Sequence, residues 1–84
     1  MSSESRLREI VIELLEVEAE DVVMEADLRK SLEADSLALM EILQEIDEEW
    51  AKGDDVIIDD DTAQTLKTFG DAVREIDKYL AAQA

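Results

Sequence analysis

The chain has 84 residues and a net charge of −16, and 46% of its residues are hydrophobic. This length suits one small domain, and the apolar content argues against disorder despite the charge. Because the chain contains neither cysteine nor histidine, it can form no disulfide, thiolate metal site, Ser–His–Asp triad or Cys–His pair. A chain this acidic should repel nucleic acid and anionic membranes and should attract basic protein surfaces. With no membrane-length apolar run and no signal pattern, we expect a cytoplasmic protein without membrane insertion.

The first predicted element is an amphipathic helix from about Ser5 to Glu16, because apolar residues recur there at helical spacing. Ser3 or Ser5 is expected to cap its N-terminus. Residues 17–34 show no clean period and predict a long loop, with at most one short turn of helix. The apolar residues expected to hold this loop on the core are Val17, Val22, Leu28 and Leu32. Loops of this length are uncommon in small domains and are often functional.

A second helix is predicted from Asp35 or Ser36 to about Trp50. Its core-facing stripe consists of Leu39, Ile42, Leu43, Ile46 and Trp50. Residues 54–61 are mostly acidic, and we expect the apolar residues within them to dock this connection onto the core, namely Val56, Ile57 and Ile58. A short helix is expected around Asp60 to Leu66.

The last helix should begin near Thr68, since Thr68 and Asp71 have the spacing of a capping box. Its apolar face consists of Phe69, Ala72, Val73, Ile76 and Leu80. The fold class predicted is therefore all-α. We expect a small up-down bundle of three main helices plus one short helix, with the long loop between the first and second main helices.

Ser36 is the candidate site for chemistry, because it lies at the predicted start of the second helix. Backbone N–H groups and the helix dipole favour a phosphate at such a position, and a corner between loop and helix is open to a modifying enzyme. Asp35 and Ser36 are also ordinary N-cap residues, however. Spacing alone favours that purely structural interpretation.

A resemblance to a known family changes this balance. Asp35-Ser36-Leu37 resembles the Asp-Ser-Leu motif of acyl carrier proteins, in which the serine carries 4′-phosphopantetheine. The likeness covers nearly the whole chain: residues 46–50 are similar to the family's acidic helix that ends in an aromatic residue, and Val17, an acidic stretch and Val22 fit its first loop. The resemblance implies one acyl-carrier domain over residues 1–84, with covalent 4′-phosphopantetheine on Ser36 and with Asp35 and Leu37 beside it.

The resemblance also implies how the protein would act. It would hold acyl groups as thioesters on the arm and present them to biosynthetic enzymes, in a lipid or fatty-acid pathway; it would have no catalytic residue and would not be an enzyme. The expected partners are a phosphopantetheinyl transferase and acyl-ligase, synthase or acyltransferase enzymes with basic docking patches. We expect a monomer. The bundle residues expected to shelter the acyl chain are Leu39, Leu43, Ile46 and Ile76.

The second helix is the expected docking face, since it is the recognition helix of the family. The residues assigned to this face are Leu37, Met40, Glu41, Gln44, Asp47 and Glu48. From Glu33 to Asp61 there are twelve acidic residues and one base, Lys52, and this asymmetry suits steering onto a basic partner. A solvated charged face is the structural alternative. The acidic run at residues 54–61 lacks the EF-hand pattern, so no dedicated metal site is expected.

Several positions depart from the family pattern. Glu16 and Glu33 stand where glycine is usual, Ala38 where an acidic residue is common, and Asp59 where proline is frequent; the segment after Trp50 appears lengthened. If the backbone at Glu33 needs a positive φ, the glutamate is strained and the loop takes a different path.

These departures suggest a specialised carrier, with drift in a general fatty-acid carrier as the equal alternative. Two other functions stay open from the residues. One is an aminoacyl or peptidyl carrier with the same serine and arm. The other is a noncatalytic acidic interaction protein, in which Ser36 is never modified.

Overall fold

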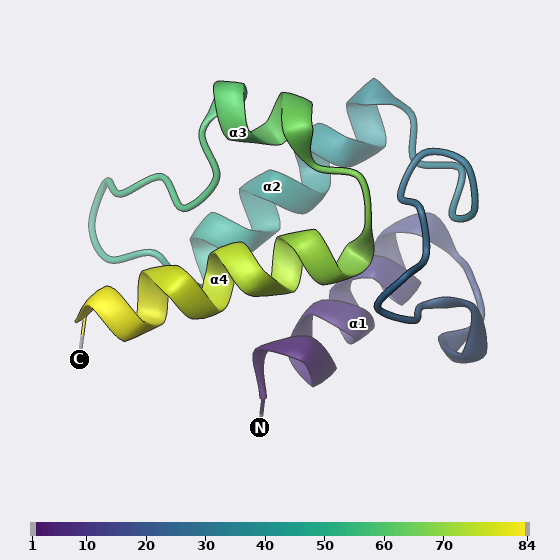
Figure 1. Cartoon of the computed structure of the whole chain (residues 1–84), viewed down its shortest axis with the longest axis horizontal. Coiled ribbons are helices and arrows are strands. Elements are labelled where there is room, and N and C mark those ends of the chain that lie inside the picture. The colour runs from purple at the N-terminus through teal and green to yellow at the C-terminus, as the bar shows by residue number, and fades with distance from the viewer. Residues whose placement is uncertain (1, 84) are drawn as a thin grey trace.

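The computed structural model describes residues 2–83. Its elements follow in the order α1 (Ser3–Leu15), the 3-10 turn η1 (Ala19–Asp21), α2 (Ser36–Trp50), α3 (Asp60–Thr65) and α4 (Phe69–Gln83). The predicted all-α fold, with three main helices and one short one, is confirmed. Figure 1 shows α2 and α4 running in roughly the same direction and α1 running against them.

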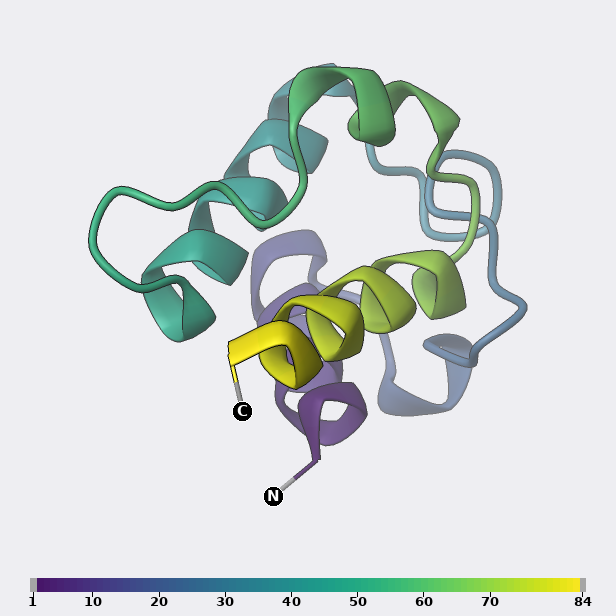
Figure 2. The same ribbon diagram turned by 60° about the vertical axis from the view of Figure 1, so that its left-hand side comes forward.

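The core lies where α1, α2 and α4 pack against one another. Figure 2 shows the short α3 at the edge of this bundle, next to the start of α2. The largest fully buried side chains come from every main helix and from the long loop: Phe69, Leu7, Leu28, Ile42, Ile46, Ile76, Val11 and Val22. The predicted stripes therefore face inward, as apolar burial requires.

The ends of α1 and α4 differ from the prediction. Ser2 caps α1, in place of Ser3 or Ser5, because its Oγ accepts a hydrogen bond from the backbone N–H of Ser5 at 3.2 Å. Leu80 was assigned to the apolar face of α4, but it is 37% exposed. Figure 1 shows the reason: the last turns of α4 extend past the N-terminal start of α1.

The loop at residues 17–34 is confirmed as irregular, with one turn of 3-10 helix. Val22, Leu28 and Leu32 are buried and Val17 is partly buried, so these apolar residues hold it as expected. Backbone bonds join it to the connection before α4: Leu28 N–H donates to the Lys67 carbonyl at 2.9 Å. The long loop is therefore attached firmly at the end of the bundle where α2 begins.

The connection between α2 and α3 docks only in part. Ile58 is buried and Ile57 is partly buried, whereas Val56 is 60% exposed, which corrects the expectation that all three reach the core. The reason is local: Asp47 Oδ1 of α2 accepts the Ile57 N–H at 3.0 Å and so sets the direction of the chain.

Tyr79 of α4 holds the other half of this connection. Its hydroxyl accepts a hydrogen bond from the Lys52 N–H at 2.9 Å and donates one to Asp55 Oδ2 at 2.7 Å. The bond to Asp55 raises the pKa of the Tyr79 hydroxyl. The segment that appeared lengthened in the sequence is therefore tied to both α2 and α4.

Candidate functional site

The start of α2 is capped by Asp35. Its Oδ1 accepts the Ala38 N–H at 2.8 Å, and its carbonyl accepts the Leu39 N–H at 2.9 Å. Among residues 2–83, no hydrogen bond engages the hydroxyl of Ser36, which is exposed. Asp35 therefore performs the capping role, and Ser36 is left free for a chemical one.

The first turn of α2 suits a phosphoryl group on Ser36 Oγ. A helix leaves its first four N–H groups without intrahelical partners. Asp35 Oδ1 satisfies that of Ala38, and among residues 2–83 no hydrogen bond engages the N–H groups of Ser36 and Leu37, which lie at the positive end of the helix dipole. The first turn contains no acidic side chain, and Ala38 is one reason.

A groove of about 300 Å³ opens between α2 and α3 beside this serine. Its lining residues are Arg29, Ser36, Leu39, Met40, Leu43, Asp60, Ala63 and Gln64. Leu39 and Leu43, two of the four residues expected to shelter the acyl chain, line it. Ile46 and Ile76 do not line this groove, because both are fully buried in the packed centre of the bundle.

A second hollow, of about 450 Å³, lies on the adjacent face of α2. It is lined by Leu37, Met40, Glu41, Leu43, Gln44, Asp47, Val56, Ile58 and Asp60. Three of the large exposed apolar side chains meet here: Leu37 at 66%, Met40 at 65% and Val56 at 60% exposure. The structure thus brings five of the six predicted docking residues to one hollow, and leaves Glu48 outside its lining.

Two of the predicted docking residues, Asp47 and Glu48, differ in how far their charge is exposed. Asp47 is half-buried with its carboxylate bonded to the Ile57 N–H, so it shapes the hollow more than it presents charge. Glu48 is exposed, and its hydrogen bond with Glu45, together with the repulsion between the two carboxylates, raises the pKa of Glu45. Within the described residues, the ion pairs involve neither Glu41 nor Glu48, whereas Glu49 pairs with Arg6 at 3.0 Å. The two unpaired glutamates keep their charge available to a partner.

Comparison with known proteins supplies the family. Residues 5–76 match the family described as the phosphopantetheine attachment site. An acyl carrier protein of Desulforapulum autotrophicum is 42% identical over 79 residues, which cover 93% of this chain and 97% of that protein. Acyl carrier proteins of Karelsulcia muelleri and Porphyromonas gingivalis are 41% and 38% identical, over 90% and 92% of this chain and 87% and 94% of their own lengths.

The chain belongs to the acyl carrier protein family. It is therefore an acyl carrier with a covalent 4′-phosphopantetheine arm, which holds acyl groups as thioesters, and the three relatives are named acyl carrier proteins. Within residues 2–83, no cluster of three or more acidic side chains could hold a metal ion, and no helix is long and apolar enough to cross a membrane.

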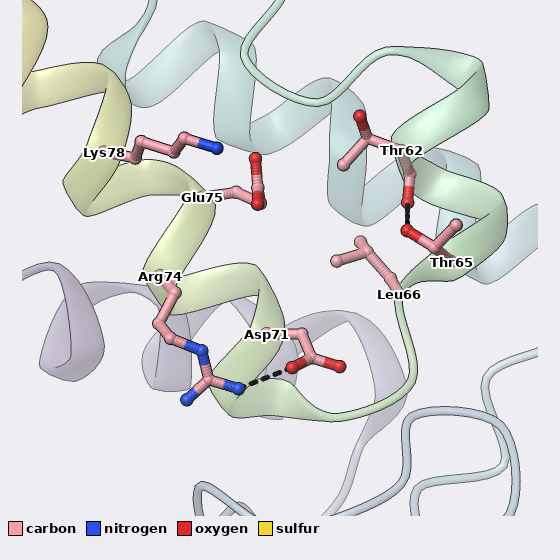
Figure 3. A pocket seen from close by; sticks show the side chains of 7 residues that line it. All are labelled: Thr62, Thr65, Leu66, Asp71, Arg74, Glu75 and Lys78. Carbon is pink, nitrogen blue, oxygen red and sulfur yellow. Dashed lines mark hydrogen bonds and ion pairs between the residues drawn. The ribbon is translucent and has the colours of Figure 1, made fainter.

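A third hollow of the carrier, of about 370 Å³, lies between α3 and α4. Figure 3 shows its mixed lining, with Thr62, Thr65 and Leu66 on one side and Asp71, Arg74, Glu75 and Lys78 on the other. Arg74 pairs with Asp71, whose Oδ2 also accepts the Thr68 N–H in the predicted capping box. That backbone bond is the main reason why the pKa of Asp71 is lowered. These charges serve the start of α4 and lie apart from Ser36.

Sequence reasoning missed Arg29 and the α3 wall of the groove. Arg29 lies seven positions before the serine, in a loop without periodicity, and Ala63 and Gln64 follow it by a long stretch of chain. No local pattern connects these residues, since only the tertiary fold places α3 across the groove from α2. The place of Val56 in the hollow on α2 was not predicted either, for the same reason.

Proposed function

We propose that Ser36 is the attachment point of the 4′-phosphopantetheine arm. The observation that carries the proposal is the capping of α2 by Asp35, which leaves the Ser36 hydroxyl exposed and unbonded beside the groove. In the transfer, Ser36 Oγ forms a bond to the phosphorus that bears pantetheine in coenzyme A. The phosphoanhydride bond to adenosine 3′,5′-bisphosphate breaks, and the hydroxyl proton leaves to the transferase. The arm supplies a terminal thiol that holds an acyl group as a thioester.

The hollow on α2 is the proposed docking surface for partner enzymes. Leu37, Met40 and Val56 offer apolar contact, and Glu41 and Glu48 offer negative charge around it. A partner with a basic patch and a protruding apolar side chain matches both features. The transferase and the acyl-ligase, synthase or acyltransferase enzymes that load and unload the arm are the proposed partners, and residues 1–84 act as one carrier domain.

The decisive test is labelling with coenzyme A and a broad-specificity phosphopantetheinyl transferase, read by intact mass. The wild type should gain one arm, and Ser36→Ala should gain none while keeping its helical circular dichroism. Ser31→Ala is the matched control, because Ser31 is an exposed serine of the adjacent loop whose side chain makes no described hydrogen bond, and it should be labelled normally. Labelling of Ser36→Ala, or none of the wild type, contradicts the proposal.

We also propose that the carrier serves a specialised acyl route. Val56, on the lengthened connection, supplies part of the docking hollow, and Ala38 leaves the first turn of α2 without an acid. Both features alter the surface that a partner reads, and specificity is a difference of affinities. Mass analysis of the load on protein purified from its own host tests this: ordinary saturated fatty acyl chains of varied length contradict it, and one unusual acyl group supports it.

A further inference from the structure

A fixed turn before α2 positions Arg29. Asp27 Oδ1 accepts the backbone N–H groups of Arg29 at 2.9 Å and Lys30 at 2.8 Å, which lowers the pKa of the Asp27 carboxyl, the bond from Lys30 contributing most. The Asp27 carbonyl accepts two further N–H groups. Leu28, which lies between Asp27 and Arg29 in the chain, is buried. The backbone of Arg29 is therefore held on several sides, although its side chain is exposed.

The Arg29 side chain lies across the groove beside Ser36. Its Nη1 donates to the carbonyl of Leu66, the C-cap residue of α3, at 3.0 Å. The chain has eight basic residues, and within the described part Arg29 is the one that lines the groove shared with Ser36. Among residues 2–83 no ion pair engages it, so its charge is not neutralised by a neighbouring acid. Its remaining guanidinium N–H groups are free to bind an anion.

We propose that Arg29 binds the phosphodiester of the arm on Ser36, an inference that rests on the proposed attachment site. A phosphodiester on Ser36 Oγ enters a region of negative potential, with Asp35 as the cap and Asp60 in the groove wall. Arginine opposes this potential with a permanent charge and a planar set of donors suited to phosphate oxygens. Arg29 and the N–H groups of Ser36 and Leu37 together hold the phosphodiester, and the groove that Arg29 and Ser36 share leads the arm past Leu39 and Leu43.

A purely structural role predicts something different. If Arg29 only binds the Leu66 carbonyl, it supports the end of α3 to the same extent with or without an arm. If it binds the phosphodiester, part of its contribution exists only in the modified protein. The difference between the two forms of one variant therefore separates the two roles.

The experiment compares unmodified and arm-bearing forms of the wild type, Arg29→Gln, Arg29→Lys and Lys78→Gln. Lys78→Gln is the matched control, because it removes one positive charge from an exposed position on α4, away from the groove. Intact mass first confirms one arm on each. The readouts are the melting temperature of each form and the ³¹P resonance of the phosphodiester.

Arm attachment should raise the melting temperature of Arg29→Gln by less, or lower it by more, than it does for the wild type. Lys78→Gln should match the wild type, and Arg29→Lys should fall between. The ³¹P resonance should shift in Arg29→Gln and not in Lys78→Gln, and high salt should shrink both differences. Equal melting shifts and an unmoved ³¹P resonance in Arg29→Gln overturn the inference and leave Arg29 as a cap of α3. If intact mass shows no arm on the wild type, the attachment site itself is wrong and the inference falls with it.

Discussion

Two glutamates occupy backbone conformations that favour glycine. Glu16 and Glu33 both have φ of 55°, in the left-handed region. Glu33 therefore has the positive φ at which a glutamate is strained, and the backbone adopts this conformation despite its side chain. The reason lies in its neighbours, because Leu32 and Ala34 are each only 2% exposed, and the Ala34 N–H donates to the Leu28 carbonyl at 2.8 Å. Burial on both sides outweighs the local strain.

Replacing Glu33 by glycine should stabilise the protein. A left-handed non-glycine residue costs about 1–2 kcal/mol. Glycine removes this strain but loses about 0.5–1 kcal/mol through its greater freedom in the unfolded chain. We expect Glu33→Gly to exceed Glu33→Ala by roughly 0.5–1 kcal/mol in the free energy of unfolding from urea titration. The alanine variant is the control, since it removes the same charge and keeps the Cβ; equal values would show that strain at this residue is negligible.

At the scale of elements, α2 combines three tasks in one helix. One side packs Leu39, Ile42 and Ile46 into the core, the first turn presents Ser36, and the exposed side contributes Leu37 and its acidic neighbours to the docking hollow. This division is possible because a helix returns to the same face every three or four residues. A partner that reads the exposed side of α2 is therefore brought next to the serine at its start.

Charge reversal on α2 should slow the encounter with the transferase. Glu41→Lys combined with Glu48→Lys should lower the association rate on the order of tenfold at low salt, and the loss should shrink as salt screens the charges. Stopped-flow or surface-binding kinetics measures it. The control is Glu9→Lys with Glu20→Lys, which makes the same change in net charge on exposed residues of α1 and η1. A control as slow as the α2 variant would mean that net charge, and not the docking face, sets the rate.

Leu37→Ala in the same assay should act differently. Leu37 is 66% exposed, so its contribution to a complex comes from apolar burial. We expect the variant to weaken binding mainly through faster dissociation, with the salt dependence of the wild type retained. A change in the salt slope would place Leu37 outside the interface and point to an indirect effect on α2.

For the whole molecule, acidic repulsion and acidic caps act in opposite directions on stability. The chain has 24 acidic and 8 basic residues, so most carboxylates repel one another in the compact state. Three aspartates have a pKa below their ordinary value of 3.8, chiefly because backbone N–H groups bond to them: Asp27, Asp59 and Asp71. Glu45, beside Glu48, has a pKa above its ordinary value of 4.5.

The stability of the protein should therefore pass through a maximum as pH falls. A raised carboxyl pKa makes the folded state bind more protons than the unfolded state, so stability increases as pH drops from 7 toward the raised pKa of Glu45. A lowered pKa does the reverse, so the contribution of the three capping aspartates is lost as pH falls below their ordinary value of 3.8 and through their folded values. The urea midpoint, measured from pH 7 to pH 3, should peak below neutral pH and above the pH range in which the three aspartates become protonated.

Two variants test which carboxyl groups cause the rise and the fall of stability with pH. Glu45→Gln should flatten the rise between pH 7 and the peak, and Asp59→Asn should reduce the fall on the acid side, because Asp59 Oδ1 caps α3 by accepting the Thr62 N–H at 2.8 Å. High salt should also flatten the rise in stability between pH 7 and the peak, since it screens exposed carboxylates. A profile that falls continuously from pH 7 would contradict the assignment of repulsion as the dominant charge effect.

The sequence by itself determined the helices, the capping box at the start of α4 and the serine that stands at the head of α2. These features depend on apolar spacing and capping residues within three or four positions, which operate inside a single element. The resemblance around Asp35-Ser36-Leu37 then pointed to the family. Only the tertiary structure decided which residues share a surface with that serine. Arg29 and Ala63 line the groove beside it, Val56 lines the adjacent hollow, and Ile46 and Ile76 line neither. The path of the two long connections and the position of α3 beside the groove bring together segments that are distant along the chain. Contacts of that kind follow from burying one common core, and no short stretch of sequence contains them.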